Sequence, residues 1–113
     1  MFEHDNVEIV RVYFDCYAQR DRATLEKLLV KSLVFKSSYA VYTDRDEMLD
    51  EIWPHVITNR SRVENLKCFQ CDDQVIARYD LINNGVTRIC ELFEFETNRI
   101  KSIEVFVGAS TQS

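Results

Sequence analysis

The second half of the chain contains four strand-like runs joined by very short turns, and this pattern restricts the fold more than any other feature. The turns consist of Asp, Asn, Gly and Thr residues, which favour tight reversals of the backbone. Such short links leave neighbouring strands antiparallel. The sequence therefore predicts a four-stranded antiparallel meander, with strands at about residues 62–71, 74–82, 86–96 and 99–107.

The first half of the chain shows helical periodicity instead. Apolar residues recur at helical spacing after Asp5, Asp21 and Asp44, and each of these aspartates is suited to cap the start of a helix. Pro54 is expected to end or kink the third helix. Residues 33–38 read as a short strand that we expect to join the meander. Helices followed by strands indicate the α+β class.

Nothing in the sequence marks a boundary between domains. The chain has 113 residues, 46% of them hydrophobic, with only two glycines and one proline. A chain of this size and composition can bury a core unaided and is too apolar to remain disordered. We therefore expect a single domain over residues 1–113.

The charge of the chain argues against two kinds of partner. Its net charge is −5, and no cluster of Lys and Arg occurs. Nucleic acids and anionic membrane surfaces both require a basic patch, so we expect neither. The start, Met1–Asp5, is acidic where a secretory signal would be basic, and no apolar run is long enough to span a bilayer. These features predict a cytoplasmic protein.

The four cysteines do not form a convincing metal site. Cys68 and Cys71 have the spacing of a zinc or redox motif, but positions three apart on a strand point to opposite faces. Cys16 and Cys90 lack the spacing of a second ligand pair. No glycine-rich loop suited to a phosphate occurs. We therefore expect small hydrophobic thiols, no metal and no cofactor.

Glu91 carries the most information about function. If residues 86–96 alternate as a strand, Glu91 lies in the middle of the more apolar face, which should turn toward the helices. A carboxylate there must find a partner, reach water in a cavity or stay protonated. Two interpretations remain open. Glu91 either reaches solvent at a sheet rim or pairs with Arg78 or Lys36, or it marks a pocket between helices and sheet.

Several segments together resemble a known family. Residues 12–21 read as a first helix ending in an aspartate, residues 33–38 as a first strand, and residues 91–95 and 99–108 as the last two strands. In this order and spacing they resemble the nuclear transport factor 2-like superfamily, in its SnoaL-like and ketosteroid isomerase-like branch. The resemblance implies a cone-shaped fold of N-terminal helices on a strongly curved antiparallel sheet (a cystatin-like roll). It also implies a pocket at the open end and a homodimer through the outer sheet face.

The same resemblance suggests roles for individual residues. Ketosteroid isomerases use a tyrosine on the first helix and a protonated acid on a late strand to stabilise an enolate oxygen. Tyr13 and Glu91 match these two positions. The carboxylate that serves as the isomerase base falls at Ser37 here, and a serine hydroxyl is too weakly basic to replace it unaided. This departure argues against isomerase activity.

We therefore expect a ligand pocket and name two sets of candidate residues. The candidates for catalysis are Tyr13, Glu91 and His55, where His55 is either a base or an exposed loop residue. The predicted lining of the pocket consists of Tyr13, Phe35, Ser37, Trp53, Glu91 and Phe93. Tyr13, Trp53 and Phe93 have an alternative role as plain core residues.

Three functions fit this pattern, and we favour them in the order given. The first is binding of a small, mostly apolar molecule, anchored by Tyr13 and Glu91. The second is a non-catalytic association module that forms a homodimer through Val86, Cys90 and Leu92 on the outer sheet face. The third is an acid–base enzyme of the isomerase, cyclase or dehydratase kind, for which no base is evident.

Overall fold

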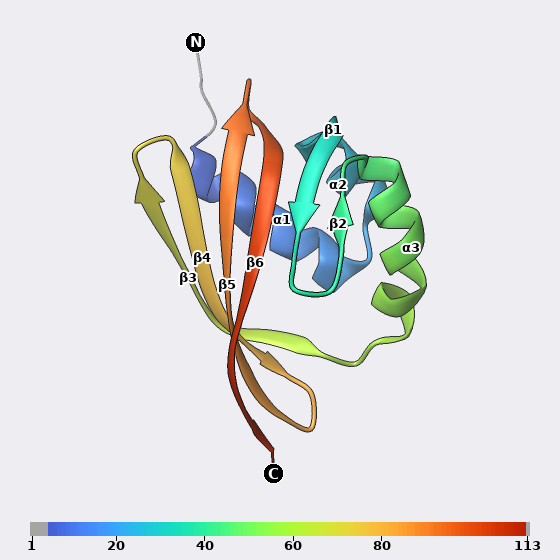
Figure 1. Cartoon of the computed structure of the whole chain (residues 1–113), viewed down its shortest axis with the longest axis vertical. Helices are drawn as coiled ribbons and strands as arrows, with labels where there is room; N and C mark the ends of the chain where they lie inside the picture. The colour runs from blue at the N-terminus through green and yellow to red at the C-terminus, as the bar shows by residue number, and fades with distance from the viewer. Residues whose placement is uncertain (1–4, 113) are drawn as a thin grey trace.

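The structure is a computed structural model that describes residues 5–112 and consists of three helices and one six-stranded sheet (Figure 1). Residues 1–4, which form most of the acidic start, and Ser113 lie outside the described range. The elements run in the order α1 (Asn6–Gln19), α2 (Arg22–Leu28), β1 (Leu29–Lys36), β2 (Val41–Tyr42), α3 (Arg45–Thr58), β3 (Arg62–Cys71), β4 (Gln74–Ile82), β5 (Gly85–Glu96) and β6 (Arg99–Gln112).

The strands form one mixed sheet in the order β2-β1-β6-β5-β4-β3. Strands β3 to β6 are antiparallel neighbours, so the predicted meander is confirmed. β1 joins the meander beside β6, as expected, but it runs parallel to β6. Because α3 and four strands separate β1 from β6 in the chain, no short turn dictates their relative direction. The expectation of a purely antiparallel sheet is therefore wrong at this one junction.

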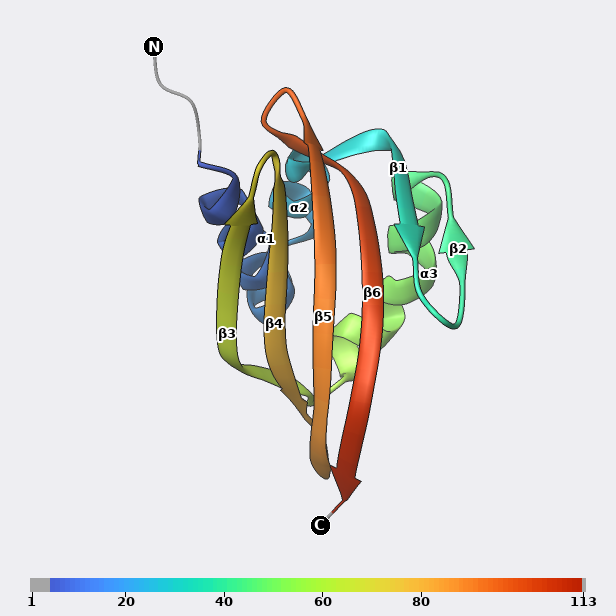
Figure 2. The same cartoon turned by 60° about the vertical axis from the view of Figure 1, so that its left-hand side comes forward.

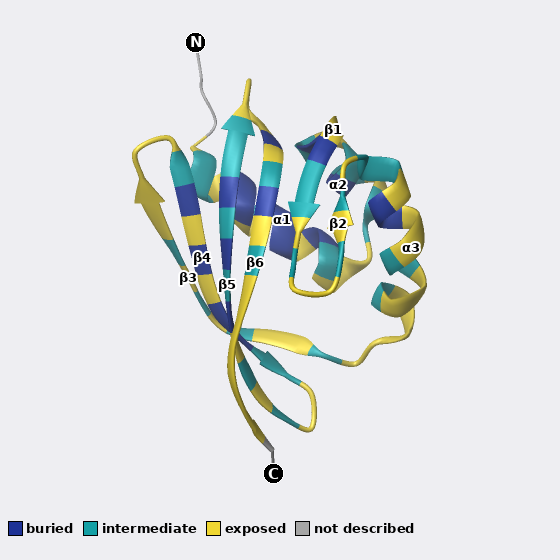
Figure 3. Ribbon diagram, in the orientation of Figure 1, coloured by how far each residue is buried: buried dark blue, intermediate teal, exposed yellow. Residues whose placement is uncertain are grey.

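The three helices lie on one side of the curved sheet. In Figures 1 and 2, α1 crosses the inner face of the meander, while α2 and α3 lie near β1 and β2. Buried positions alternate along β4 and β5 and mark the face toward α1 (Figure 3). The largest fully buried side chains include Phe93, Leu25, Leu29, Leu33, Met48, Leu49, Ile100 and Ile103. The predicted α+β fold of helices on a curved sheet is confirmed.

The three predicted helix caps are present. A carboxylate oxygen accepts the backbone N–H two or three residues on, at 2.9 Å for Asp5, 3.1 Å for Asp21 and 2.9 Å for Asp44. Each bond satisfies an N–H that the start of a helix leaves without an intrahelical partner. The starts of all three helices thus follow from local sequence chemistry.

Pro54 does not end α3, which continues for one more turn to Thr58. A proline inside a helix leaves one carbonyl without its N–H partner, and this cost is smallest where water can reach the backbone. Pro54 is exposed, and the Thr58 hydroxyl donates to the Pro54 carbonyl at 2.8 Å. This side-chain bond supports the last turn. As a consequence, His55 lies on a helix rather than in a loop.

The last strand is longer than predicted. β6 continues past Val107 to Gln112 and pairs with the start of β5. The extension is poor in apolar residues, so its strand character comes from backbone pairing and leaves little signal in the sequence. Gly108 suits this stretch because a Cβ there would lie 3.1 Å from the Arg88 carbonyl oxygen. Within residues 5–112, no helix is long and apolar enough to cross a membrane.

Candidate functional site

A cavity of about 700 Å³ lies between α1, the end of α3, the start of β3 and the inner face of the sheet. This volume falls within the range of about 300–1,000 Å³ that is usual for small-molecule sites. Its more enclosed part is lined by Tyr13, Phe14, Tyr17, Phe35, Tyr79 and Glu91. Its exposed part, called the mouth below, is lined by Asp15, Arg20, Asn59, Arg60 and Arg62.

Glu91 lies in the wall of this cavity, near the middle of the meander. Its strand neighbours are Ala77 on β4 and Val105 on β6, and only 5% of its surface is exposed. The Tyr79 hydroxyl donates a hydrogen bond to its Oε2. Glu91 forms no ion pair within residues 5–112. In the structure, Glu91 therefore neither reaches solvent at a rim of the sheet nor pairs with Arg78 or Lys36.

The second carboxylate oxygen of Glu91 is available to a ligand. Within residues 5–112, Oε2 is the Glu91 oxygen that has a protein partner, and no fully enclosed side-chain oxygen lacks one. Oε1 must therefore retain contact with the cavity. Because Oε1 is reachable but unpaired, it can form a hydrogen bond with a bound molecule.

Burial sets the protonation of Glu91. Desolvation raises its pKa from the ordinary 4.5 to about 7, and the hydrogen bond from Tyr79 opposes this shift only in part. Both protonation states are therefore populated near neutral pH. The protonated acid can donate a hydrogen bond into the cavity, and the ionised carboxylate can accept a proton.

Three tyrosines supply further hydroxyl groups to the cavity. Burial raises the pKa of Tyr13, Tyr17 and Tyr79 above the ordinary value, and the nearby Glu91 charge adds to the shift for each. These hydroxyls therefore stay protonated at neutral pH. Tyr13 donates to the Tyr17 hydroxyl at 3.3 Å, which leaves the Tyr17 proton free to bond a ligand.

The structure brings together only part of the predicted pocket lining. Tyr13, Phe35 and Glu91 line the large cavity. Phe93 is fully buried beneath it, with its ring edge-to-face against Tyr13 at a centroid distance of 5.2 Å. Trp53 stands outside the lining and packs against the Tyr17 ring at 6.3 Å. These two aromatic rings support the wall and do not face the cavity.

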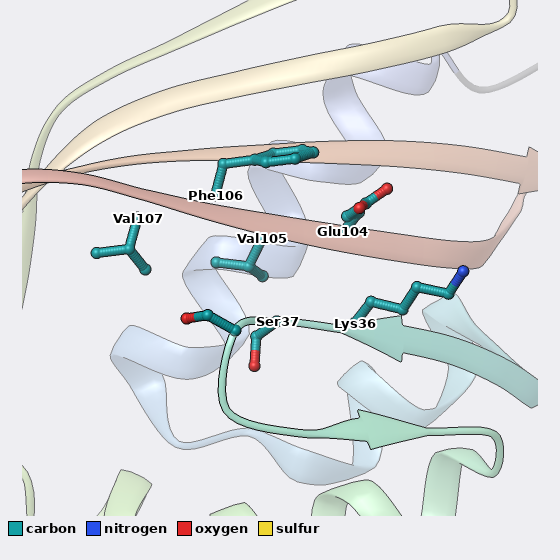
Figure 4. Close-up of a pocket in the computed structure, with 7 residues that line it drawn as sticks. Lys36, Ser37, Glu104, Val105, Phe106 and Val107 are labelled. Carbon is teal, nitrogen blue, oxygen red and sulfur yellow. The ribbon is translucent and has the colours of Figure 1, made fainter.

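Ser37 and His55 also lie away from the large cavity. Ser37 lines a separate pocket of about 390 Å³ between the β1–β2 turn and β6 (Figure 4). Its hydroxyl oxygen accepts the backbone N–H groups of Tyr39 and Ala40, each at 3.2 Å, so it stabilises the turn. His55 is exposed on α3 and does not line either pocket.

Sequence reasoning missed Tyr17 and Tyr79 as members of the site. Tyr79 pairs with Ile89 and thus lies diagonally across from Glu91 on the adjacent strand. The short Asn83-Asn84-Gly85 turn fixes this register, so a careful alignment of the two strands could have found it. Tyr17 follows Tyr13 by one helical turn, which places both on the same helix face.

No family model matches the chain, and no curated protein matches its sequence. Solved structures do match. An NTF2-like protein of unknown function from Mesorhizobium loti has 18% identity and a TM-score of 0.79, with 96% of this chain and 98% of that chain covered. A "putative polyketide cyclase" from Pseudomonas putida has 11% identity and a TM-score of 0.81, with 92% of each chain covered.

A second "putative polyketide cyclase", from Sinorhizobium meliloti, has 18% identity and a TM-score of 0.76, with 88% of this chain and 94% of that chain covered. These likenesses confirm the resemblance to the nuclear transport factor 2-like superfamily at the level of the fold. Identities this low carry no site residue or substrate from one protein to another.

The raised pKa of Glu91 predicts how stability depends on pH. The folded protein holds this proton up to about pH 7, whereas the unfolded chain releases it near pH 4.5. The free energy of unfolding of the wild type therefore decreases as the pH rises from 4.5 to 7. Relative to the wild type, Glu91→Gln should gain about 3 kcal/mol of unfolding free energy across this range and nothing further above it.

Urea denaturation of both proteins between acidic and weakly alkaline pH measures this difference. Glu96→Gln is the matched control, because it removes an equal charge from an exposed position of the same strand. Its difference from the wild type should change little with pH. If the unfolding free energies of Glu91→Gln and the wild type differ by the same amount at all pH values, the raised pKa of Glu91 is contradicted.

Proposed function

We propose that the large cavity binds a small, mostly apolar molecule whose polar group bonds to Glu91. One observation carries this proposal: Glu91 Oε1 is a reachable oxygen of a buried side chain, and it has no protein partner among residues 5–112. Buried polar groups in proteins are almost always paired. A ligand atom provides the missing partner.

The lining favours a flat ligand with an oxygen at one end. Aromatic side chains offer large apolar faces that stack well on rings, and Tyr13, Tyr17 and Tyr79 place hydroxyl groups near Glu91. A carbonyl or hydroxyl oxygen suits this polar end, because it accepts from a protonated Glu91 or from Tyr17. The two fold relatives described as polyketide cyclases also support a small organic ligand.

Blocking the cavity tests the proposal. Pyrenebutanol, a fluorescent ring system with a terminal hydroxyl, serves as the probe, and fluorescence anisotropy reports its binding. Ala18 lines the cavity from an exposed position on α1, so Ala18→Trp should fill the entrance. We expect the affinity to fall by at least about tenfold, or about 1.4 kcal/mol.

Ala23→Trp is the matched control, because Ala23 is equally exposed on α2 and does not line the cavity. It should bind pyrenebutanol like the wild type. Equal affinity of the wild type and Ala18→Trp, or no binding to the wild type, would refute the proposed site.

A second function, acid–base catalysis, is favoured by the pKa of Glu91, which is near 7. General bases work best when their pKa lies near the operating pH. Since Ser37 faces another pocket, Glu91 itself would take the proton from a carbon beside a carbonyl. Tyr17 would donate a hydrogen bond to the resulting enolate oxygen, and the protonated Glu91 would return the proton.

Exchange of protons beside the β-tetralone carbonyl for solvent deuterium, followed by NMR, measures this step. If Glu91 is the base, the exchange rate should rise with an apparent pKa near 7, and Glu91→Gln should lower it by at least about a hundredfold. Glu96→Gln should leave it unchanged. Equal rates in the wild type and Glu91→Gln would restrict the function to binding.

We also propose that the protein forms a homodimer through the outer face of the meander. Phe69, Ile76, Val86 and Phe106 are at least 37% exposed, and strand pairing places Phe69 beside Ile76 and Cys90 beside Phe106. Apolar side chains gathered on one face are typical of an association surface. Leu92, which pairs with Ile76, continues the same surface.

Sedimentation equilibrium at micromolar concentration should give twice the mass of one chain. Phe106→Glu places a charge in this surface and should yield a monomer, because burying an unpaired carboxylate is costly. Tyr39→Glu changes an aromatic residue that is 86% exposed on the β1–β2 turn and should remain dimeric. A monomeric wild type would refute the homodimer.

We also propose that the protein acts in the cytoplasm. All four cysteines are free in the structure, and Cys71 is exposed. Exposed free thiols are typical of a reducing compartment, since oxidising compartments favour disulfides.

A further inference from the structure

The mouth of the large cavity differs in charge from the protein as a whole. The chain carries a net charge of −5, yet three arginines, Arg20, Arg60 and Arg62, line the mouth against a single exposed carboxylate, Asp15. A cleft lined by one sign of charge attracts ligands of the opposite sign.

Two of these arginines are available to a ligand. Arg62 pairs with Glu64 on the same strand. Among the ion pairs formed within residues 5–112, none involves Arg20 or Arg60. A guanidinium without a protein carboxylate retains its planar set of donors for another one.

Arg20 occupies a backbone position that glycine would suit better, which provides a mild way to remove its side chain. Arg20 closes α1 in the left-handed conformation, with φ 56° and ψ 40°, and Asp21 N–H bonds to the Cys16 carbonyl at 2.8 Å. Glycine is the residue that best suits this position. Replacement of Arg20 by glycine should therefore remove the guanidinium without straining the end of α1.

We infer that the ligand of this cavity is an apolar molecule with a carboxylate at its outer end, held by Arg20 and Arg60, and with a neutral oxygen at its inner end near Glu91. This inference rests on the proposed binding function and adds the chemical class and orientation of the ligand. The reverse orientation is disfavoured, because a ligand carboxylate beside Glu91 would bring two buried negative charges together.

Two matched probes test the inference. Pyrenebutyrate and pyrenebutanol share one ring system and differ in one polar group: a carboxylate, which Arg20 and Arg60 can bind at the mouth, or a hydroxyl, which Glu91 can bind at the inner end. The wild type should bind pyrenebutyrate about fivefold more tightly than pyrenebutanol at low ionic strength. This preference should shrink as NaCl rises from about 0.02 M to about 0.5 M, since exposed charges are screened.

The double variant Arg20→Gly with Arg60→Gln should bind pyrenebutyrate no more tightly than pyrenebutanol. Arg20→Gly relieves the left-handed conformation, so the melting temperature of the single variant should not fall. Arg99→Gln is the matched control: Arg99 is exposed at the β5–β6 turn and does not line the cavity, so this variant should keep the preference.

The outcomes separate this inference from the proposed function. Equal affinity of the wild type for both probes, or a preference that survives in the double variant, overturns the charged orientation and leaves the cavity as a binding site. Failure of both probes to bind the wild type overturns the binding site and the inference together.

Discussion

Glu91 is a carboxylate that the sheet places among aromatic rings, where desolvation raises its pKa to about 7. Its hydrogen bond from Tyr79 compensates only part of this penalty. Holding the ionised form costs about 3 kcal/mol, a large share of the roughly 5–15 kcal/mol that stabilises a typical domain. An apolar residue would avoid the cost. The fold therefore has no need of Glu91, which points to a role in the cavity.

The position of Glu91 depends on the register of β4 and β5. Asn83-Asn84-Gly85 links these strands, with Asn84 and Gly85 at positive φ, and the turn sets Ala77 opposite Glu91 and Tyr79 opposite Ile89. A slip of one residue would send every inward side chain of a strand to the outer face. One short turn thus determines both the inward position of Glu91 and its hydrogen bond.

Local chemistry accounts for what could be predicted from the sequence. The alternation along β5 and the capping aspartates each act within a few residues, so the inward face of Glu91 and the helix starts were evident. The direction of β1 and the burial of Phe93 depend on contacts between distant segments. The course of α3 past Pro54 depends on a side-chain hydrogen bond within its last turn, which the periodicity of the sequence does not reveal. Ser37 was expected in the large cavity, but it lies in the β1–β2 turn and lines a separate pocket.

The two ends of the cavity differ in how they respond to a bound molecule. An apolar ligand displaces water around Glu91 and favours its neutral form further, whereas the arginines at the mouth are exposed to solvent. A ligand oxygen that accepts from protonated Glu91 selects the protonated protein. Binding and proton uptake are then linked, since each stabilises the state that the other prefers. Above pH 7, Glu91 must take up a proton from solvent before it can donate to such a ligand. A neutral acceptor should therefore bind more weakly as Glu91 ionises.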